Sequence, residues 1–148
     1  MTLVCPYCGS GTKLVLGKAI YADRWPNLAD KPFWACDRYP TCDAYVGCHP
    51  GTETPLGRLA NKELRQWKLK AHNAFDPLWQ AKLARRRQEQ GHYPKARARG
   101  SGYKWLAAQL GVPVDQCHIG MFDVDTCKRV VALCEPYTRR CKSHGAAA

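Results

Sequence analysis

The chain has 148 residues, and Lys and Arg outnumber Asp and Glu by 23 to 12, which gives a net charge of +11. A surplus of this size favours a polyanionic partner, most often nucleic acid. No apolar run approaches the ~20 residues that a membrane span needs, and the N-terminal region contains no apolar core of a signal peptide. We therefore expect a soluble, cytoplasmic protein that does not enter a membrane.

The chain contains nine cysteines, and four of them form two short hooks. The first hook is the motif CPYCG, with Cys5 and Cys8, and the second is CDRYPTC, with Cys36 and Cys42. Paired hooks are typical of zinc ribbons, in which four thiolates hold Zn²⁺ at about 2.3 Å and leave no open position. Such a closed site stabilises a fold and does no chemistry. We predict one structural zinc ion in a reducing compartment, and no disulfide framework.

Short β-prone runs accompany the two hooks. Residues 13–16 and 19–21 flank a Gly-Lys pair and predict a hairpin. Residues 31–36 predict a strand that enters the second hook, and residues 43–47 predict a strand that leaves it. We predict that residues 1–50 form a zinc ribbon of short antiparallel strands. Because a unit this small buries little apolar area, the metal must supply much of its folding free energy.

Residues 1–46 carry a family resemblance in the motif CPYCG and in the aromatic-led stretch FWACDRYPTC. They resemble the C-terminal zinc ribbons of type IA DNA topoisomerases, which have a CPxCG hook and an aromatic strand leading into Cys-x-x-Tyr-Pro-x-Cys. The resemblance implies metal ligands at Cys5, Cys8, Cys36 and Cys42, and contacts to single-stranded DNA from the ribbon face. The segment between the hooks is longer here, and one ribbon is present where topoisomerases carry several.

Aromatic and basic residues are interleaved around the second hook. Bases stack on aromatic faces while cations neutralise phosphates, so Lys31, Trp34, Arg38 and Tyr39 are candidate nucleic-acid contacts. The alternative for Trp34 is a structural role, in which it covers the metal site with the neighbouring aromatic residues. The turn residues Arg38 and Tyr39 are the better candidates for direct contact.

Residues 51–148 predict a small basic helical unit. Thr54 and Pro55 are suited to start a helix whose apolar stripe runs to Trp67, and Asp76 with Pro77 to start a second one. Further along, Ser101 is suited to cap a helix that Gly111 ends, and Asp123 or Asp125 to cap a last helix through Cys134. With the ribbon, these helices predict an α+β protein.

Basic residues dominate the segment from Lys82 to Lys104, which holds eight Lys or Arg and one Glu. Its middle, near residues 88–101, contains Gly and Pro, and we predict a flexible arm there that contacts phosphates. The alternative is a solvated helix face followed by a linker. The candidate contacts are Arg85, Arg86, Arg87, Lys95, Arg97 and Arg99.

Several strings along the chain carry a second resemblance, which covers nearly its whole length. They are GCHPGT at 47–52, PLG at 55–57, AHNAFDPLW at 71–79, WLA at 105–107 and CHIGMFD at 117–123. They are similar to the zinc-finger-containing domain family of phage and prophage proteins. This resemblance implies a bacterial or phage context but no particular mechanism.

The remaining Cys, His and Asp residues leave two metal alternatives open. Cys134, Cys141 and His144 offer three ligands for a second zinc, but no fourth ligand is evident and a second ion is not expected. A metal-dependent nuclease centre is the other alternative. Its candidate residues are His49, His72, Asp76, His118 and Asp123.

The function predicted from these features is nucleic-acid binding without catalysis. DNA is favoured over RNA because of the topoisomerase-like ribbon, and specificity is expected to be low because no recognition helix is evident. The first alternative is the metal-dependent nuclease. The second is a phage inhibitor or adaptor whose basic face docks on a host protein.

Overall fold

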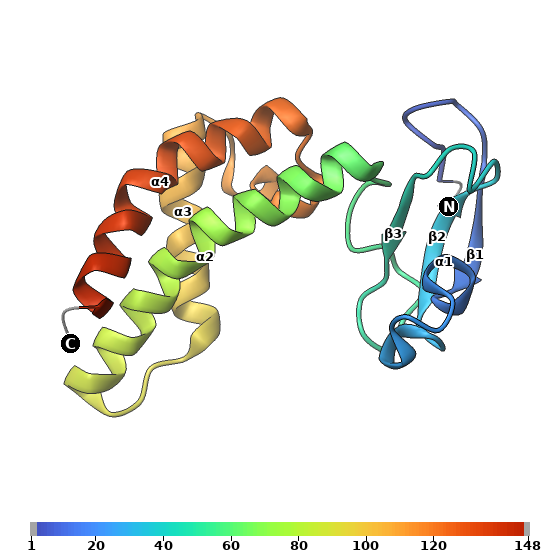
Figure 1. Cartoon of the computed structure of the whole chain (residues 1–148). Coiled ribbons are helices and arrows are strands. Elements are labelled where there is room, and N and C mark those ends of the chain that lie inside the picture. Colours follow the sequence, from blue (N-terminus) through green and yellow to red (C-terminus); the bar gives the residue numbers. More distant parts are fainter. Residues whose placement is uncertain (1–2, 147–148) are drawn as a thin grey trace. The chain divides into compact units, whose positions relative to one another are not determined.

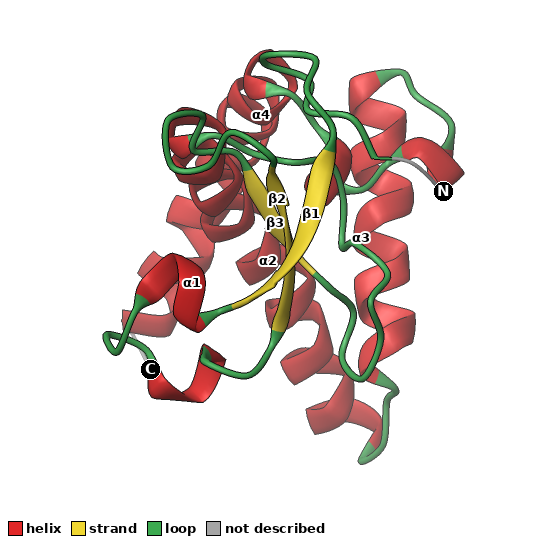
Figure 2. Ribbon diagram, turned by 90° about the vertical axis from the view of Figure 1, so that its right-hand side faces the viewer, coloured by secondary structure: helices red, strands yellow, loops and turns green. Residues whose placement is uncertain are grey.

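The computed structural model describes residues 3–146, with side chains up to Cys141, and the chain divides into two compact units, Met1–Arg65 and Gln66–Ala148. The strands belong to the first unit, whereas the second is built from helices (Figures 1 and 2). This is the α+β class predicted from the sequence. Within residues 3–146, no helix is both long enough and apolar enough to cross a lipid bilayer.

A three-stranded antiparallel sheet in the order β1-β2-β3 forms the centre of the first unit. Its central strand is the most buried, because neighbours cover it on both edges; Trp34 pairs with Leu14 on one side and with Val46 on the other. The strands predicted at residues 31–36 and 43–47 are confirmed. The three strands are β1 (Thr12–Leu16), β2 (Pro32–Cys36) and β3 (Tyr45–Gly47).

The hairpin predicted at residues 13–21 is wrong in its second half. Lys18–Tyr21 form the short helix α1, a 3₁₀ turn at Pro26–Leu28 follows, and β1 pairs with β2 instead. Gly17 turns the chain out of the sheet. Its amide donates to the carbonyl of Lys31 at 2.8 Å, and its own carbonyl accepts from amides of α1. Pro32–Cys36 is more apolar than Lys18–Tyr21, and it takes the place beside β1.

The helix predicted from Thr54 begins later than expected. Helix α2 spans Lys62–Gln90, and Asn61 caps it by accepting a hydrogen bond of 3.0 Å from an amide of the first turn. The residues before it are extended, because Ala60 and Tyr45 exchange backbone hydrogen bonds of 3.0 and 3.1 Å. This pairing keeps the loop with the sheet, so the first unit continues beyond the boundary predicted at residue 50.

Helix α2 also continues through Pro77, where the sequence predicts a new helix. A proline inside a helix removes one hydrogen bond and costs about 3 kcal/mol. The apolar stripe of Phe75, Trp79 and Leu83 stays in register across this position and is buried, which offsets that cost at about 1.5–3 kcal/mol per large side chain. Asp76 caps no helix; its carboxylate instead bonds to two side chains of α2.

The arm expected near residues 88–101 is instead largely helical. Helix α3 spans Lys95–Leu110 and ends at Gly111, which has a φ of 72°. It begins before the predicted cap at Ser101 because Ala98 is fully buried and belongs to the apolar face. The predicted cap of the last helix is confirmed, since Asp123 accepts a 2.8 Å hydrogen bond from an amide at the start of α4 (Val124–Ala146).

Helices α2, α3 and α4 lie side by side and share one core (Figure 1). Arg129 of α4 donates to the carbonyl of Leu110 at the end of α3 at 3.2 Å, and the hydroxyl of Thr138 donates to the carbonyl of Ala74 in α2. These bonds fix the last helix against the other two. The core includes the buried residues Ala71, Phe75, Trp79, Tyr103, Leu106, Ile119, Phe122, Cys127, Val130 and Cys134.

Candidate metal centre

Each cysteine hook is a tight turn closed by backbone hydrogen bonds. In the first hook, the amide of Cys5 donates to the carbonyl of Ser10 at 2.8 Å, and the amide of Gly9 donates to the carbonyl of Cys5 at 2.9 Å. Gly9 has a φ of 74°, a conformation in which residues with a Cβ are strained. In the second hook, the amide of Cys42 donates to the carbonyl of Arg38 at 3.1 Å. These turns point both sulfurs of each hook inward.

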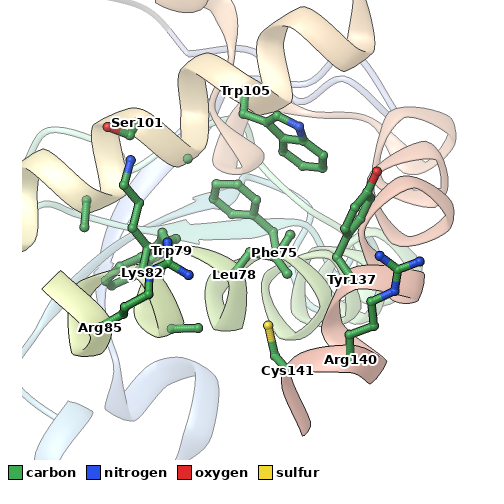
Figure 3. Close-up of a pocket in the computed structure, with 13 residues that line it drawn as sticks. Phe75, Leu78, Trp79, Lys82, Arg85, Ser101, Trp105, Tyr137, Arg140 and Cys141 are labelled. Carbon is green, nitrogen blue, oxygen red and sulfur yellow. The ribbon is translucent and has the colours of Figure 1, made fainter. Parts of the chain in front are cut away.

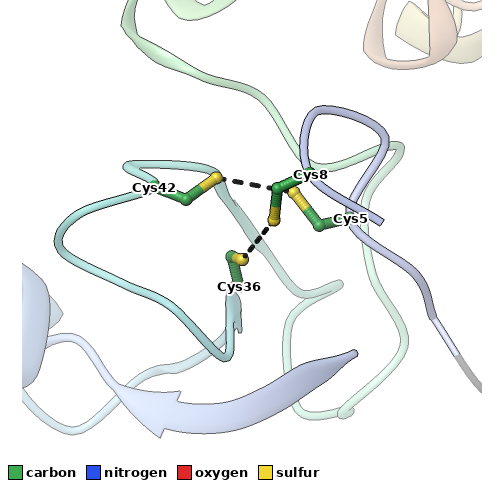
Figure 4. A group of neighbouring side chains, drawn as sticks. All are labelled: Cys5, Cys8, Cys36 and Cys42. Atoms are coloured by element: carbon green, nitrogen blue, oxygen red, sulfur yellow. Dashed lines mark hydrogen bonds between the residues drawn. The ribbon is translucent and has the colours of Figure 1, made fainter. Parts of the chain in front are cut away.

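The four sulfurs of Cys5, Cys8, Cys36 and Cys42 converge on one point (Figure 4). All lie within 4.8 Å of one another; Cys5 is 3.6 Å from Cys42, and Cys8 is 3.4 Å from Cys36. A tetrahedral ion with bonds of about 2.3 Å needs sulfurs roughly 3.8 Å apart, whereas a disulfide needs about 2.05 Å. All four cysteines are free. The group therefore fits one zinc ion, as predicted.

Apolar side chains cover the sulfur cluster. Cys5 and Cys36 are buried together with Ala44 and Leu59, and Trp34 packs against them. Trp34 thus makes the contacts expected of the structural alternative, while its role in base stacking stays a prediction. Leu59 lies in the stretch from Thr54 to Trp67 that the sequence predicts as helical, and its place over the cysteines could not be predicted, because the loop that returns it to them depends on long-range contacts.

Local surroundings change the acidity of the thiols in opposite directions. Burial raises the pKa of Cys36 to about 12 and also raises that of Cys42. Hydrogen bonds to Ser10 lower the pKa of Cys8 to about 6. The amide of Arg38 points at the sulfur of Cys36 at 3.4 Å, which suits a thiolate. A divalent cation supplies the charge that makes buried thiolates stable, so metal and protons compete for these sulfurs.

Two paired hooks, four inward sulfurs and short antiparallel strands define a structural zinc-ribbon site of the closed, four-thiolate class. The zinc-finger-containing domain family has a model that matches residues 1–137, and the chain belongs to this family. No curated protein matches the chain, and no solved structure matches it.

The predicted nucleic-acid contacts of the ribbon differ in how free they are. Lys31 and Arg38 are exposed, and Tyr39 is half-buried with its ring 6.2 Å from that of Tyr45. Trp34 is half-buried, and its indole Nε1 donates to the carbonyl of Glu53 at 2.6 Å. Of these four candidates, the two cations present the most accessible groups.

The predicted contacts of the helical unit already make intramolecular interactions. Arg86 pairs with Glu89 at 3.5 Å, and Arg87 donates to the carbonyl of Tyr93 at 3.1 Å. Lys95, Arg97 and Arg99 lie over the rings of Trp79, Tyr93 and Tyr103, 5.1 to 5.7 Å from their centroids. All three cations nevertheless remain exposed. Arg85 is exposed.

Two of the predicted nuclease residues, His72 and Asp76, lie together on α2. The imidazole Nδ1 of His72 lies 3.2 Å from Asp76. The ring of His118 instead lies 5.9 Å from that of Tyr103. Groups of three or more His, Cys, Asp or Glu side chains can hold a metal ion when their ligand atoms lie close together. Among the described side chains, the four ribbon cysteines are the one such group. The side chain of His144, a candidate ligand for a second zinc, lies outside the described part.

Proposed function

We propose that this zinc-ribbon protein binds nucleic acid, preferably DNA, with low sequence specificity. The observation that carries the proposal is the segment from Lys82 to Lys104, where eight cations accompany a single acid. That acid, Glu89, pairs with Arg86, so the other seven cations keep their charge uncompensated within the segment. A surface of this kind attracts phosphates and releases counterions when it binds them.

The ribbon supports the same function through its exposed cations. Lys31 and Arg38 lie in solvent, and Tyr39, which follows Arg38 in the chain, is half-buried. A cation next to an accessible aromatic face suits a single-stranded nucleic acid, in which phosphates and unstacked bases alternate. The resemblance of residues 1–46 to topoisomerase ribbons favours single-stranded DNA.

The family strings also bear on the biological setting. The segments at 47–52, 71–79 and 117–123 are similar to phage and prophage proteins, and we take the protein to belong to that setting. Nucleic-acid binding with low specificity suits such a setting, because many different sequences must be bound.

The test is a binding titration of the zinc-loaded full chain with single- and double-stranded DNA and RNA between low and moderate salt. We expect single-stranded DNA to bind most tightly, with a log–log salt slope of about −0.7 per phosphate contact. Replacing Arg38 or Arg97 by Gln should reduce the magnitude of this slope by about that amount. The matched control is Arg139→Gln, which removes one charge from an exposed ion pair with Glu135.

Two outcomes contradict the proposal. If no nucleic acid binds at low salt, and a host protein is retained by the folded chain, the protein is an interaction factor. If Arg139→Gln lowers affinity as much as Arg38→Gln does, the binding reflects net charge alone and the assigned surface is wrong.

A further inference from the structure

A cavity of about 470 Å³ opens between helices α2, α3 and α4 of the helical unit (Figure 3). This volume falls in the range of small-molecule sites, about 300–1,000 Å³. Phe75 and Trp79 come from α2, Trp105 from α3 and Tyr137 from α4. The metal centre lies outside this unit, so the cavity is a separate feature that the ribbon does not explain.

The walls of the cavity are aromatic. Phe75 and Trp79 are buried and form its fixed part, whereas Trp105 is half-buried and Tyr137 is exposed over 47% of its surface. The rings of Trp105 and Tyr137 meet edge to face, with centroids 5.5 Å apart. This arrangement leaves accessible ring surface at the opening, where a planar heteroaromatic group can stack.

The charges around the cavity all have one sign. Lys82, Arg85 and Arg140 contribute to its lining, and no Asp or Glu among the described residues does. Lys82 and Arg85 have no ion-pair partner among the described side chains, and Arg140 lies 5.8 Å from the ring centroid of Tyr137. In Figure 3, Lys82 extends toward Ser101 across the opening. A ligand anion therefore meets cations without an opposing carboxylate.

We propose that this cavity binds one nucleotide, with its base against the aromatic walls and its phosphate held by Lys82 and Arg85, which lie at the same end of the opening (Figure 3). Arg presents a planar fork that matches a phosphate, and a phosphate dianion matches several cations better than a single carboxylate does. Among the described side chains, the lining contains no Asn, Gln, Asp or Glu to read base edges, so different bases should bind with similar affinity. The inference rests on the proposed function in taking a nucleotide as the anion.

The same chemistry has two sources, a free mononucleotide and an unstacked nucleotide of a single strand. The experiment titrates the zinc-loaded full chain with adenosine monophosphate, adenosine, ribose 5-phosphate, inorganic phosphate and a short single-stranded oligonucleotide. Tryptophan fluorescence and the indole N–H resonance of Trp105 report the occupancy of the cavity. We expect adenosine monophosphate to bind at least about tenfold more tightly than adenosine or ribose 5-phosphate, because each lacks one of the two recognised groups.

Arg85→Gln is the decisive variant, because Arg85 is exposed and its loss leaves the core intact. It should weaken binding of adenosine monophosphate about tenfold or more, the loss expected for one charge-assisted bond to phosphate. Trp105→Leu should weaken it similarly, and far-UV circular dichroism verifies that this variant folds. The matched control is Lys128→Gln, which removes an exposed cation of α4 that neither lines the cavity nor belongs to the segment from Lys82 to Lys104.

The outcomes separate this inference from the proposed function. If adenosine monophosphate fails to bind at millimolar concentration, or binds Arg85→Gln as tightly as the unaltered chain, the inference is overturned. If oligonucleotides bind nonetheless, the proposed function survives this failure. If adenosine monophosphate binds in the cavity while no oligonucleotide binds, the inference holds and the proposed function fails.

Discussion

The indole Nε1 of Trp79 donates a hydrogen bond of 3.0 Å to the carboxylate of Asp76, one turn earlier on α2. The second carboxylate oxygen lies 3.2 Å from Nδ1 of His72. Asp76 therefore holds two side chains of the helix on either side of Pro77, and Trp79 is also a wall of the cavity. The carboxylate of Asp76 therefore stabilises α2 across Pro77 and also holds Trp79 in its place in the cavity wall.

Asp76→Ala should lower the free energy of unfolding of the helical unit by about 1–3 kcal/mol, because the buried indole N–H loses its acceptor. Asp76→Asn should lower it less, since the amide oxygen can still accept from Trp79. Chemical denaturation followed by circular dichroism at 222 nm measures both. Glu135→Gln is the control; its exposed ion pair with Arg139 should matter by less than about 1 kcal/mol.

The contribution of Asp76 should disappear in acid. Desolvation raises the pKa of this carboxyl, but the hydrogen bonds from His72 and Trp79 outweigh it, and the pKa lies below its ordinary value of 3.8. A lowered folded-state pKa stabilises the fold fully above the unfolded value, and this stability is lost as pH falls through the folded pKa. Unfolding free energies of the unaltered chain and Asp76→Asn should therefore converge below about pH 3.8. A constant difference down to pH 2 would refute the assignment.

Metal removal should unfold the ribbon and spare the helices. Chelation takes away the ion that supplies most of the ribbon's folding free energy, whereas helices α2 to α4 keep their own core. Helicity at 222 nm should largely persist while the near-ultraviolet signal of Trp34 collapses. Cys36→Ser should lose zinc in a colorimetric assay, whereas Cys48→Ser, a half-buried cysteine outside the cluster, should retain one ion per chain. Equal zinc contents would show that the ligands are misassigned.

Zinc binding should release protons near neutral pH. Burial raises the pKa of Cys36 to about 12 and raises that of Cys42, so both thiols are protonated when no metal is present and deprotonated when it is bound. We expect at least about two protons per zinc, and an affinity that increases with pH. Calorimetry in buffers of different ionisation enthalpy counts the protons. A heat independent of buffer would contradict this prediction.

Two glycine substitutions should have opposite effects. A Cβ at Gly17 would lie 1.9 Å from the carbonyl oxygen of Leu28, whereas a Cβ at Gly100, in the interior of α3, would meet nothing within 4 Å. Gly17→Ala should therefore destabilise the ribbon by about 1–3 kcal/mol or more. Gly100→Ala should stabilise the helical unit by about 0.5–1 kcal/mol, because alanine loses less backbone entropy in a helix. Thermal unfolding distinguishes the two; a shift in the same direction for both would be inconsistent with these contacts.

Features that depend on near neighbours in the chain could be predicted from the sequence. The spacing of Cys5, Cys8, Cys36 and Cys42 sufficed for the metal centre, because each hook is a local turn. The cap at Asp123 could be predicted for the same reason, since its partner amide is three residues away.

Features that depend on distant contacts could not be predicted. Pro77 signals a helix start in isolation, but the burial of Phe75 and Trp79 against other helices keeps α2 continuous. Likewise the spacing around Leu59 predicts a helix, but the backbone pairing of Ala60 with Tyr45 keeps this segment extended. The cavity escaped prediction because Trp105 and Tyr137 meet only when α3 packs against α4.

The first turn of α2 is fastened to the residue that follows the fourth cysteine. The amide of Lys62 and the guanidinium of Arg65 both bond to Asp43, at 3.1 and 3.3 Å, and Asp43 is adjacent to Cys42. When the ion leaves, we expect the hydrogen bonds from Lys62 and Arg65 to Asp43 to be lost and the first turn of α2 to fray. Deuterium uptake by the amides of residues 62–65 would thus serve as a reporter of metal occupancy, read from the helix instead of from the sulfurs.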